Sequence, residues 1–250
     1  MAEQGLTITK LVKDEGFQKE AEKTLGDGAQ AFLSSVLSLT NADDKLKALD
    51  PVALYNTCLM AAAIRLPFNS NLGQAYIIAY KGKPQLQIGW KGFVQLAQRS
   101  GLFKTIGSNP VRENEVAGID GMTGEILFDF KLKKEGKIVG YMAYFKLLNG
   151  FEKNLYMTVE ELEAHAKRYS QTYKSGFGVW KDNFEAMAKK TVIKMILNQY
   201  APLSINSELA RAIEIDQQDS DGDYSDNKPR VKLSSASLGS AENDDKKPQE

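Results

Sequence analysis

The sequence holds a single cysteine and a single histidine, and it has no nucleotide-binding run of the form Gly-x-x-x-x-Gly-Lys-Ser/Thr. Because Cys58 stands alone, an internal disulfide and a thiolate zinc cluster are excluded, and we expect this residue to be a buried small hydrophobe. His165 is also alone, which excludes a site built from several histidines. Without the phosphate-cradling run, we predict a protein that does not use ATP.

Long apolar runs are absent as well. The longest uninterrupted one, Leu59 to Ile64, is far shorter than the roughly 20 residues that a membrane-spanning helix requires. The first residues, Met1 to Gly5, provide neither a basic nor an apolar segment, so no secretory signal is evident. We therefore expect a cytoplasmic protein.

The formal net charge of zero hides a segregated distribution. Residues 51–203 carry 20 Lys and Arg against 12 Asp and Glu, a net charge of +8. Residues 1–50 carry 6 against 9, and residues 204–250 carry 6 against 11. A basic, aromatic-rich core between acidic flanks is typical of a protein that binds a polyanion, because lysines and arginines displace counterions from phosphates. The alternative, an ordinary solvated surface, stays open at this point.

Composition divides the chain into three segments. Residues 1–25 form a charged N-terminal arm, either mobile or a helix that needs a partner. Residues 26–207 form the core. Residues 208–250 form an acidic tail with almost no large apolar side chains beyond Asp216, which predicts disorder over most of its length.

The hydrophobic pattern predicts an α+β fold, in which helices pack around a small antiparallel sheet. We expect helices at about 29–39, 51–65, 90–99, 158–169 and 182–200, and a β-hairpin at 74–88. Asp50 and Pro51 form a typical helix start, and Thr158 with Glu161 forms a capping box. Strand patterns at 125–130, 138–147 and 154–157 predict an antiparallel meander.

Two groups of basic residues could line a nucleic-acid groove. Around the first predicted helix-turn unit lie Trp90, Lys91, Arg99, Lys104 and Arg112. The last helix and the residues before it contribute Lys181, Lys189, Lys190 and Lys194. Lys190 and Lys194 are four residues apart and so share one helix face. Core packing of Trp90 and plain solvation of the lysines are the competing interpretations.

Within the core, acidic side chains are dense only between Glu113 and Asp129, where Glu115, Asp120 and Glu125 also lie. A metal-dependent nuclease needs several converging carboxylates. The spacing here matches no nuclease signature, and solvated charges explain it better. We predict no resident metal and no cofactor, although magnesium can assist binding to DNA.

Two separated blocks of sequence resemble the RecT family of phage single-strand annealing proteins. The first comprises LPFNSNLGQAY (66–76), QLQIGWKG (85–92) and LAQRSG (96–101). The second comprises WKDNFEAMAKKT (180–191) and YAPLS (200–204). The resemblance covers about residues 25–207.

The resemblance implies an α+β core that assembles into helical filaments or rings on DNA and pairs complementary strands without ATP. It implies a homo-oligomer that works beside a phage exonuclease and a host single-strand binding protein. The family has no catalytic residues to carry over, so we expect a protein that is not an enzyme.

We therefore expect phage homologous recombination by strand annealing, with single-stranded DNA held by its phosphate backbone. A passive strand protector and, less favoured, a magnesium-dependent nuclease are the alternatives. Aromatic side chains can stack on bases while basic ones hold phosphates. The predicted DNA-binding residues are Tyr76, Trp90, Lys91, Arg99, Lys104, Arg112, Lys181, Lys189, Lys190 and Lys194.

Overall fold

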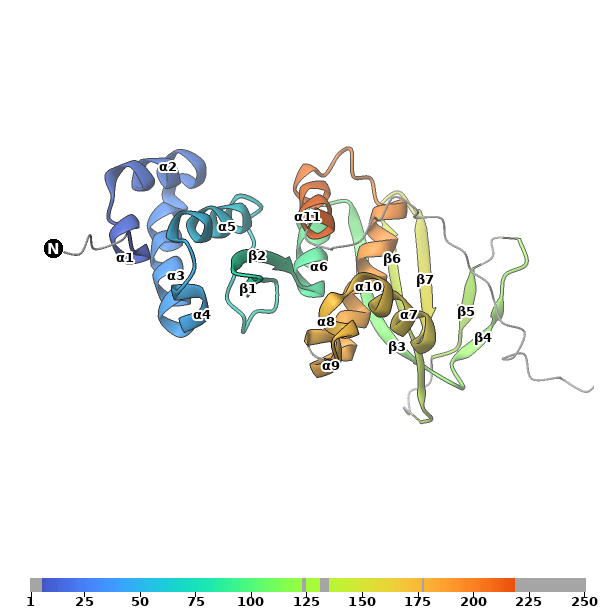
Figure 1. Ribbon diagram of the computed structural model, residues 1–250. Coiled ribbons are helices and arrows are strands. Elements are labelled where there is room, and N and C mark those ends of the chain that lie inside the picture. Colours follow the sequence, from blue (N-terminus) through green and yellow to red (C-terminus); the bar gives the residue numbers. More distant parts are fainter. Residues whose placement is uncertain (1–5, 123–124, 131–134, 177, 219–250) are drawn as a thin grey trace, which may run out of the picture.

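The computed structural model describes residues 6–122, 125–130, 135–176 and 178–218 of the chain (Figure 1). Its helices are α1 (Ile8–Leu11), α2 (Glu15–Leu25), the short 3-10 helix η1 (Gly26–Gly28), α3 (Ala29–Ala42), α4 (Asp44–Lys47), α5 (Pro51–Ala63), α6 (Trp90–Arg99), α7 (Val159–Tyr169), α8 (Gln171–Lys174), α9 (Val179–Asp182), α10 (Phe184–Tyr200) and α11 (Ser207–Gln218). Its strands are β1 (Ala75–Tyr80), β2 (Lys83–Ile88), β3 (Phe103–Arg112), β4 (Val116–Ile119), β5 (Ile126–Phe128), β6 (Ile138–Leu147) and β7 (Glu152–Thr158). The predicted α+β class is confirmed.

Helices α1 to α5 gather at one end of the molecule around a buried tyrosine (Figure 1). The Tyr55 ring lies 5.0 Å from that of Phe17 and 5.5 Å from that of Phe32, both edge-on. Its hydroxyl donates to the Phe17 carbonyl at 2.8 Å. Burial, followed by the charge of Glu20, raises the pKa of Tyr55 to about 12. An uncharged, hydrogen-bonded phenol thus anchors α2 to α5.

The sequence predicts a charged N-terminal arm over residues 1–25. The structure describes this segment from residue 6, and most of it is helical, in α1 and α2. Ile8 and Leu11 of α1, Val12 after it and Ala21 of α2 are all buried in the main core. A charge-rich composition thus coexists with a narrow apolar stripe that packs against α3 and α5.

Local signals that set element boundaries operate as the sequence predicts. The Asp50 carboxylate accepts a hydrogen bond from the Ala53 amide at 2.7 Å, with Pro51 at the first position of α5. Thr158 Oγ1 accepts from the Glu161 amide at 3.1 Å, and the Glu161 carboxylate accepts from the Thr158 amide at 2.9 Å. The helix start and the capping box are both confirmed.

Strands β1 and β2 form the predicted hairpin, paired from Ala75 with Ile88 to Tyr80 with Lys83. Its two-residue turn places Lys81 at φ 49° and Gly82 at φ 75°. Both residues have the positive φ that suits the right-handed twist of paired strands.

The predicted meander of three strands is confirmed for β6 and β7, which pair antiparallel, and is wrong for β5. The three-stranded antiparallel sheet has the order β3, β6, β7, whereas β5 pairs with β4 in a separate two-stranded sheet. The sequence pattern concealed β3, because Gly107 and Pro110 interrupt it. Proline is tolerated there because β3 is an edge strand that needs no ladder hydrogen bond on its outer side.

Helix α10 lies against one face of this sheet and contacts β3, β6 and β7 as well as α6 (Figure 1). Alternate residues of β6, Tyr141, Ala143, Phe145 and Leu147, face the core. Trp180 and Phe184 add rings 5.6 Å apart beside α10. The predicted burial of Cys58 is also confirmed.

Helix α11 follows the predicted core and covers residues that the sequence analysis assigned to the acidic tail. Leu209, Ala212, Ile213 and Ile215 are buried there, against α6, β2 and α10. Residues 219–250 of the predicted tail lie outside the described residues. Over the described ranges, none of the helices combines the length and the apolar character needed to cross a membrane.

Two glycines allow α6 to contact the chain segment before β1 backbone to backbone. A Cβ atom at Gly89 would lie 2.3 Å from the Gly73 carbonyl oxygen, and one at Gly92 would lie 2.2 Å from the Gln74 carbonyl oxygen. The Gly89 amide donates to the same Gln74 oxygen at 2.9 Å. No side chain larger than hydrogen fits at either position without moving backbone.

We expect Gly92→Ala to destabilise the protein by about 1–3 kcal/mol, because the new methyl group overpacks a rigid contact. Alanine is the better helix former, so a loss of stability isolates the steric term. Gly107→Ala is the matched control, since no atom lies within 4 Å of the added Cβ. Urea unfolding of both variants measures the difference, and equal midpoints would contradict the assigned role of Gly92.

Candidate nucleic-acid interface

Trp90 brings together two lysines from different helices. It is the first residue of α6 and is half-buried. Lys91 Nζ lies 5.9 Å from the centre of the indole, and Lys189 Nζ, from α10, lies 5.5 Å from it. Both distances are within the range of cation–π contacts. The indole of Trp90 therefore keeps two ammonium groups close to each other.

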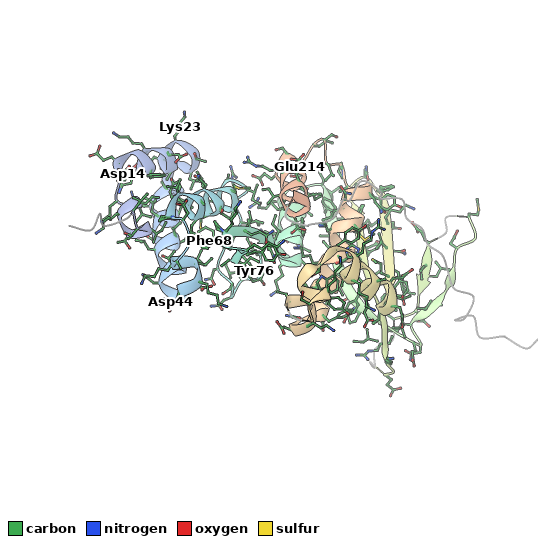
Figure 2. The ribbon with its side chains drawn as sticks, in the orientation of Figure 1. Asp14, Lys23, Asp44, Phe68, Tyr76 and Glu214 are labelled. Atoms are coloured by element: carbon green, nitrogen blue, oxygen red, sulfur yellow. The ribbon has the colours of Figure 1, made fainter. Side chains whose placement is uncertain are left out.

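Tyr76 joins this group through Gly73, which has φ +67°. A Cβ atom at Gly73 would lie 3.2 Å from Tyr76 Oη and 3.4 Å from Lys91 Cδ, so both side chains converge on the bare glycine. Figure 2 places Tyr76 beside β1 and β2, between the N-terminal helices and α10. We call Tyr76, Trp90, Lys91 and Lys189 the Trp90 cluster.

The N-terminus of α6 adds to the positive potential of the cluster. Its N-cap residue, Gly89, offers no side chain to accept from the first amides of the ten-residue helix. Amides at a helix N-terminus favour an anion, and Lys91 lies within that first turn. Aromatic rings, ammonium groups and helix amides thus share one site, which is the chemistry a nucleotide chain requires.

Lys189 also pairs with Glu185 one turn earlier, at 2.6 Å. Glu185 remains 53% exposed, so a phosphate could replace this weak contact at low cost. Lys181 is exposed and lies 4.6 Å from the centre of the Tyr173 ring. Lys104 is exposed on β3.

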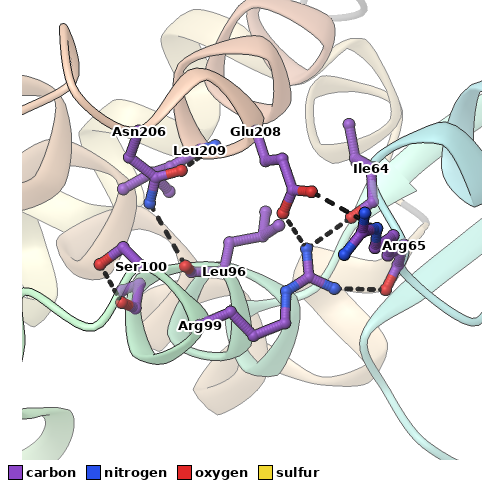
Figure 3. A network of polar contacts seen from close by, with 9 residues as sticks. Ile64, Arg65, Leu96, Arg99, Ser100, Asn206, Glu208 and Leu209 are labelled. Carbon is purple, nitrogen blue, oxygen red and sulfur yellow. Dashed lines mark hydrogen bonds and ion pairs between the residues drawn. The ribbon is translucent and has the colours of Figure 1, made fainter.

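Arg99 and Arg112, by contrast, are engaged in structural contacts. Arg99 donates to the carbonyl oxygens of Arg65 and Ile64 at 2.6 and 2.7 Å and pairs with Glu208, which ties α6 to the end of α5 and to α11 (Figure 3). Arg112 donates to the Gly136 carbonyl at 2.5 Å. The structure does not bring either guanidinium into the Trp90 cluster.

Lys190 and Lys194 hold a buried carboxylate from α11. Asp216 accepts from Lys190 Nζ at 2.5 Å and from Lys194 Nζ at 2.7 Å. The side chains of Lys190, Lys194 and Asp216 are 14%, 9% and 5% exposed. Burial alone would raise the pKa of Asp216, but the two ammonium groups outweigh it and hold that pKa below its usual range. The predicted lysine row therefore faces α11, and a phosphate would have to displace Asp216 to reach it.

His165 lies in an aromatic group beside α10. Its ring is 4.6 Å from that of Tyr169 and 6.4 Å from that of Trp180. Burial, then the charges of Lys194 and Arg168, lowers the pKa of His165 to about 4. The imidazole is therefore neutral at neutral pH and packs as an aromatic ring.

The carboxylates considered for a nuclease do not converge. Glu115 is buried and accepts from the Arg112 amide at 2.9 Å, while Glu125 pairs with Lys153 at 2.5 Å. Among the residues that the structure describes, no three His, Cys, Asp or Glu side chains form a group able to hold a metal ion.

Sequence reasoning missed the contribution of α11 to this region. Asn206 caps the helix by accepting from the Leu209 amide at 3.1 Å, and it donates to the Leu96 carbonyl at 3.3 Å. The signal was present, because Leu209, Ala212 and Ile213 recur at helical spacing after an asparagine cap. The acidic composition beyond Asp216 obscured it.

Comparison with known proteins identifies a family and two relatives. A model of the RecT family matches residues 30–232. The chain is 40% identical over 215 residues to the uncharacterized protein YqaK of Bacillus subtilis (strain 168), covering 86% of this chain and 74% of that protein. It is 26% identical over 179 residues to Protein RecT of Escherichia coli (strain K12), covering 68% of this chain and 64% of that protein.

We expect Asp216→Ala to destabilise the fold by about 3–5 kcal/mol, because it leaves two buried ammonium groups without their carboxylate. Glu185→Ala is the matched control, since it removes an exposed partner of Lys189 and should cost about 0.5 kcal/mol or less. Urea unfolding of the full chain measures both. A similar small loss in the two variants would show that the Asp216 contacts do not stabilise the fold.

Proposed function

We propose, from the premise that this chain belongs to the RecT family, that it binds single-stranded DNA and pairs it with a complementary strand without ATP. Membership in the family supports a role in DNA recombination and single-strand annealing. The observation that carries the finer proposal is the Trp90 cluster, where two lysines and two aromatic rings meet at a helix N-terminus.

In the proposed mechanism, the protein binds the phosphate backbone of one strand, and base pairing with the second strand selects the sequence. Lys91, Lys189 and the first amides of α6 hold phosphates, and these contacts carry no sequence information. Tyr76 or Trp90 stacks on a base, a contact worth about 1–3 kcal/mol. With the remaining bases facing outward, a second strand tests them by Watson–Crick pairing. Pairing then supplies both the specificity and the driving force.

Lys181 and Lys104 are exposed and would extend the phosphate path beyond the cluster. Arg99, Arg112, Lys190 and Lys194 would act indirectly, by fixing the elements that carry the cluster. The protein would need no cofactor of its own, and magnesium would assist by screening phosphates of the two strands. A phage exonuclease that exposes single strands and a host single-strand binding protein are the proposed partners, in phage homologous recombination.

The direct test is the annealing rate of two labelled complementary oligonucleotides with purified protein, magnesium and no ATP. We expect faster annealing than the spontaneous rate, with an intact duplex as the product. Slower annealing would indicate a passive strand protector instead. Shortened strands would indicate a nuclease and contradict the proposal.

We expect the double substitution Lys91→Ala and Lys189→Ala to flatten the salt dependence of binding to single-stranded DNA. Each lost phosphate contact lowers the slope of log K against log salt by roughly 0.7. The weakening should be similar for all base sequences, since the contacts are to the backbone. Titration of a fluorescent oligonucleotide at several salt concentrations measures the slope.

Lys19→Ala is the control for that measurement. It removes one positive charge from α2, where the Lys19 side chain is 75% exposed and far along the chain from the cluster. Its slope should match that of the unmodified protein. If the double variant keeps the full slope, the Trp90 cluster does not hold phosphates.

A further inference from the structure

The two ends of α11 contact different helices. Glu208, its second residue, pairs with Arg99, the last residue of α6 (Figure 3). Asp216, near the other end, accepts a hydrogen bond from Lys190 of α10 at 2.5 Å. Only residues 217 and 218 follow Asp216 within the described range. The contact with α10 therefore fixes where the chain leaves the described structure.

This exit point is close to the Trp90 cluster. Lys189 directly precedes Lys190 on α10, and its Nζ lies 5.5 Å from the indole centre of Trp90. Successive residues of a helix point about 100° apart, so Lys190 contacts α11 while Lys189 contacts α6. Two lysine side chains and one peptide unit thus connect the carboxylate of Asp216 with the cluster.

The residues that continue from α11 are rich in carboxylates. Residues 219–226, with the sequence DSDGDYSD, contain four Asp, no Lys or Arg, and the aromatic residue Tyr224. Basic residues begin at Lys228, and the whole stretch 219–250 holds 8 acidic against 5 basic residues. The carboxylates therefore come first after α11. We call residues 219–226 the Asp segment.

The Asp segment is long enough to reach the cluster. An extended chain spans at most about 3.3–3.6 Å per residue, so Asp219 can lie up to about 10 Å from Asp216, and Asp223 up to about 25 Å. The second range exceeds the length of two extended lysine side chains and the peptide unit between them. Carboxylates in the middle of the segment can therefore contact Lys189.

Carboxylates already pair with the lysines of this part of α10. Glu185 accepts from Lys189 at 2.6 Å, and Asp216 accepts from Lys190 at 2.5 Å. The Glu185 side chain is 53% exposed, and such exposed pairs are weak, so another anion can replace it. An anion that is tethered nearby competes at a high effective concentration. The Asp segment combines spaced negative charges with an aromatic ring, which are the features of a short nucleotide chain.

We propose that the Asp segment occupies the Trp90 cluster of its own chain when no DNA is bound. Its carboxylates pair with Lys91 and Lys189, and the Tyr224 ring lies against Trp90. Single-stranded DNA has to displace the segment, so the segment lowers the affinity of the protein for DNA of any base sequence. This inference rests on the proposed function, because it concerns the regulation of the same site.

The first experiment measures the affinity of the full chain for a short fluorescent oligonucleotide. The segment variant carries Asp219→Asn, Asp221→Asn, Asp223→Asn and Asp226→Asn. The control variant removes equally many charges further along the tail, by Glu242→Gln, Asp244→Asn, Asp245→Asn and Glu250→Gln. A tethered competitor whose Kd equals its effective concentration halves the apparent affinity, and one that binds ten times more tightly lowers it about tenfold.

We therefore expect the segment variant to bind the oligonucleotide about two- to tenfold more tightly than the unmodified protein, and the control variant to bind like the unmodified protein. The gain should disappear when Lys91→Ala and Lys189→Ala are also present, because the segment then lacks the groups that it occupies. No gain, equal gains in the two tail variants, or a gain that persists without the lysines would each overturn the proposal.

The second experiment uses no DNA. A carbodiimide joins a carboxylate to a lysine in contact with it, and mass spectrometry identifies the linked peptides. We expect links from the Asp segment to Lys91 or Lys189 in the unmodified full chain. Glu125 and Lys153, 2.5 Å apart, provide the positive control. Links in the control pair alone would overturn the proposal.

Isotope labelling shows whether segment and cluster belong to one chain. Labelled and unlabelled protein are mixed in equal amounts before the carbodiimide is added. We expect linked peptides that carry one label state throughout. Linked peptides that combine the two label states would overturn the contact within a chain.

The two experiments separate this inference from the proposed function. Links in the free protein together with annealing of DNA support both. If the links form and the unmodified protein neither binds nor anneals DNA, the proposed function fails and the contact of the segment stands. If DNA is annealed, no links form and the segment variant binds like the unmodified protein, the contact fails alone.

Discussion

The contact of α6 with the chain before β1 is the constraint on which the arrangement of the candidate site depends. Carbonyl oxygens of Gly73 and Gln74 occupy the space where Gly89 and Gly92 would carry a Cβ atom. This contact fixes the N-terminus of α6 over the β1–β2 hairpin, and it thereby sets Trp90 and Lys91 beside Tyr76. The same buried side of the helix carries Phe93, Leu96 and Ala97, which pack in the core. The position of the cluster is thus decided by backbone packing, before any charge is considered.

Helix α11 completes that packing with charge as well as with apolar area. Asp216 neutralises part of the positive charge of Lys190 and Lys194, and Glu208 does the same for Arg99. Both carboxylates come from one helix and reach α10 and α6. Burying ammonium groups without partners costs several kcal/mol, so these basic residues require α11 in place. The helical pattern around Lys190, Lys194 and Arg99 does not reveal these ion pairs. The carboxylate partners lie 22 to 109 residues further along the chain.

Local signals carried the prediction where structure depends on neighbours in sequence. The Asp50–Pro51 helix start, the Thr158–Glu161 capping box and the β1–β2 hairpin follow from such signals. Pairing between distant strands does not, which is why β5 was joined to the wrong sheet and β3 was missed. In the candidate site, Trp90 and Lys91 are neighbours in sequence, whereas Lys189 reaches the same indole only through the packing of α10 on α6. The ten predicted DNA-binding residues include all four members of the Trp90 cluster, but nothing in the sequence distinguished these from the arginines and lysines that hold α5, α6 and α11 together.

A count of basic residues therefore overstates the charge available to a polyanion. Arg99, Arg112, Lys190 and Lys194 contribute to the net charge of the core while their donors are directed at protein acceptors. A protomer that relies on Lys91, Lys189 and a helix terminus offers few phosphate contacts, and a few such contacts bind weakly at physiological salt. Weak sites gain strength when they are repeated along one strand, since each further site binds at a high effective concentration.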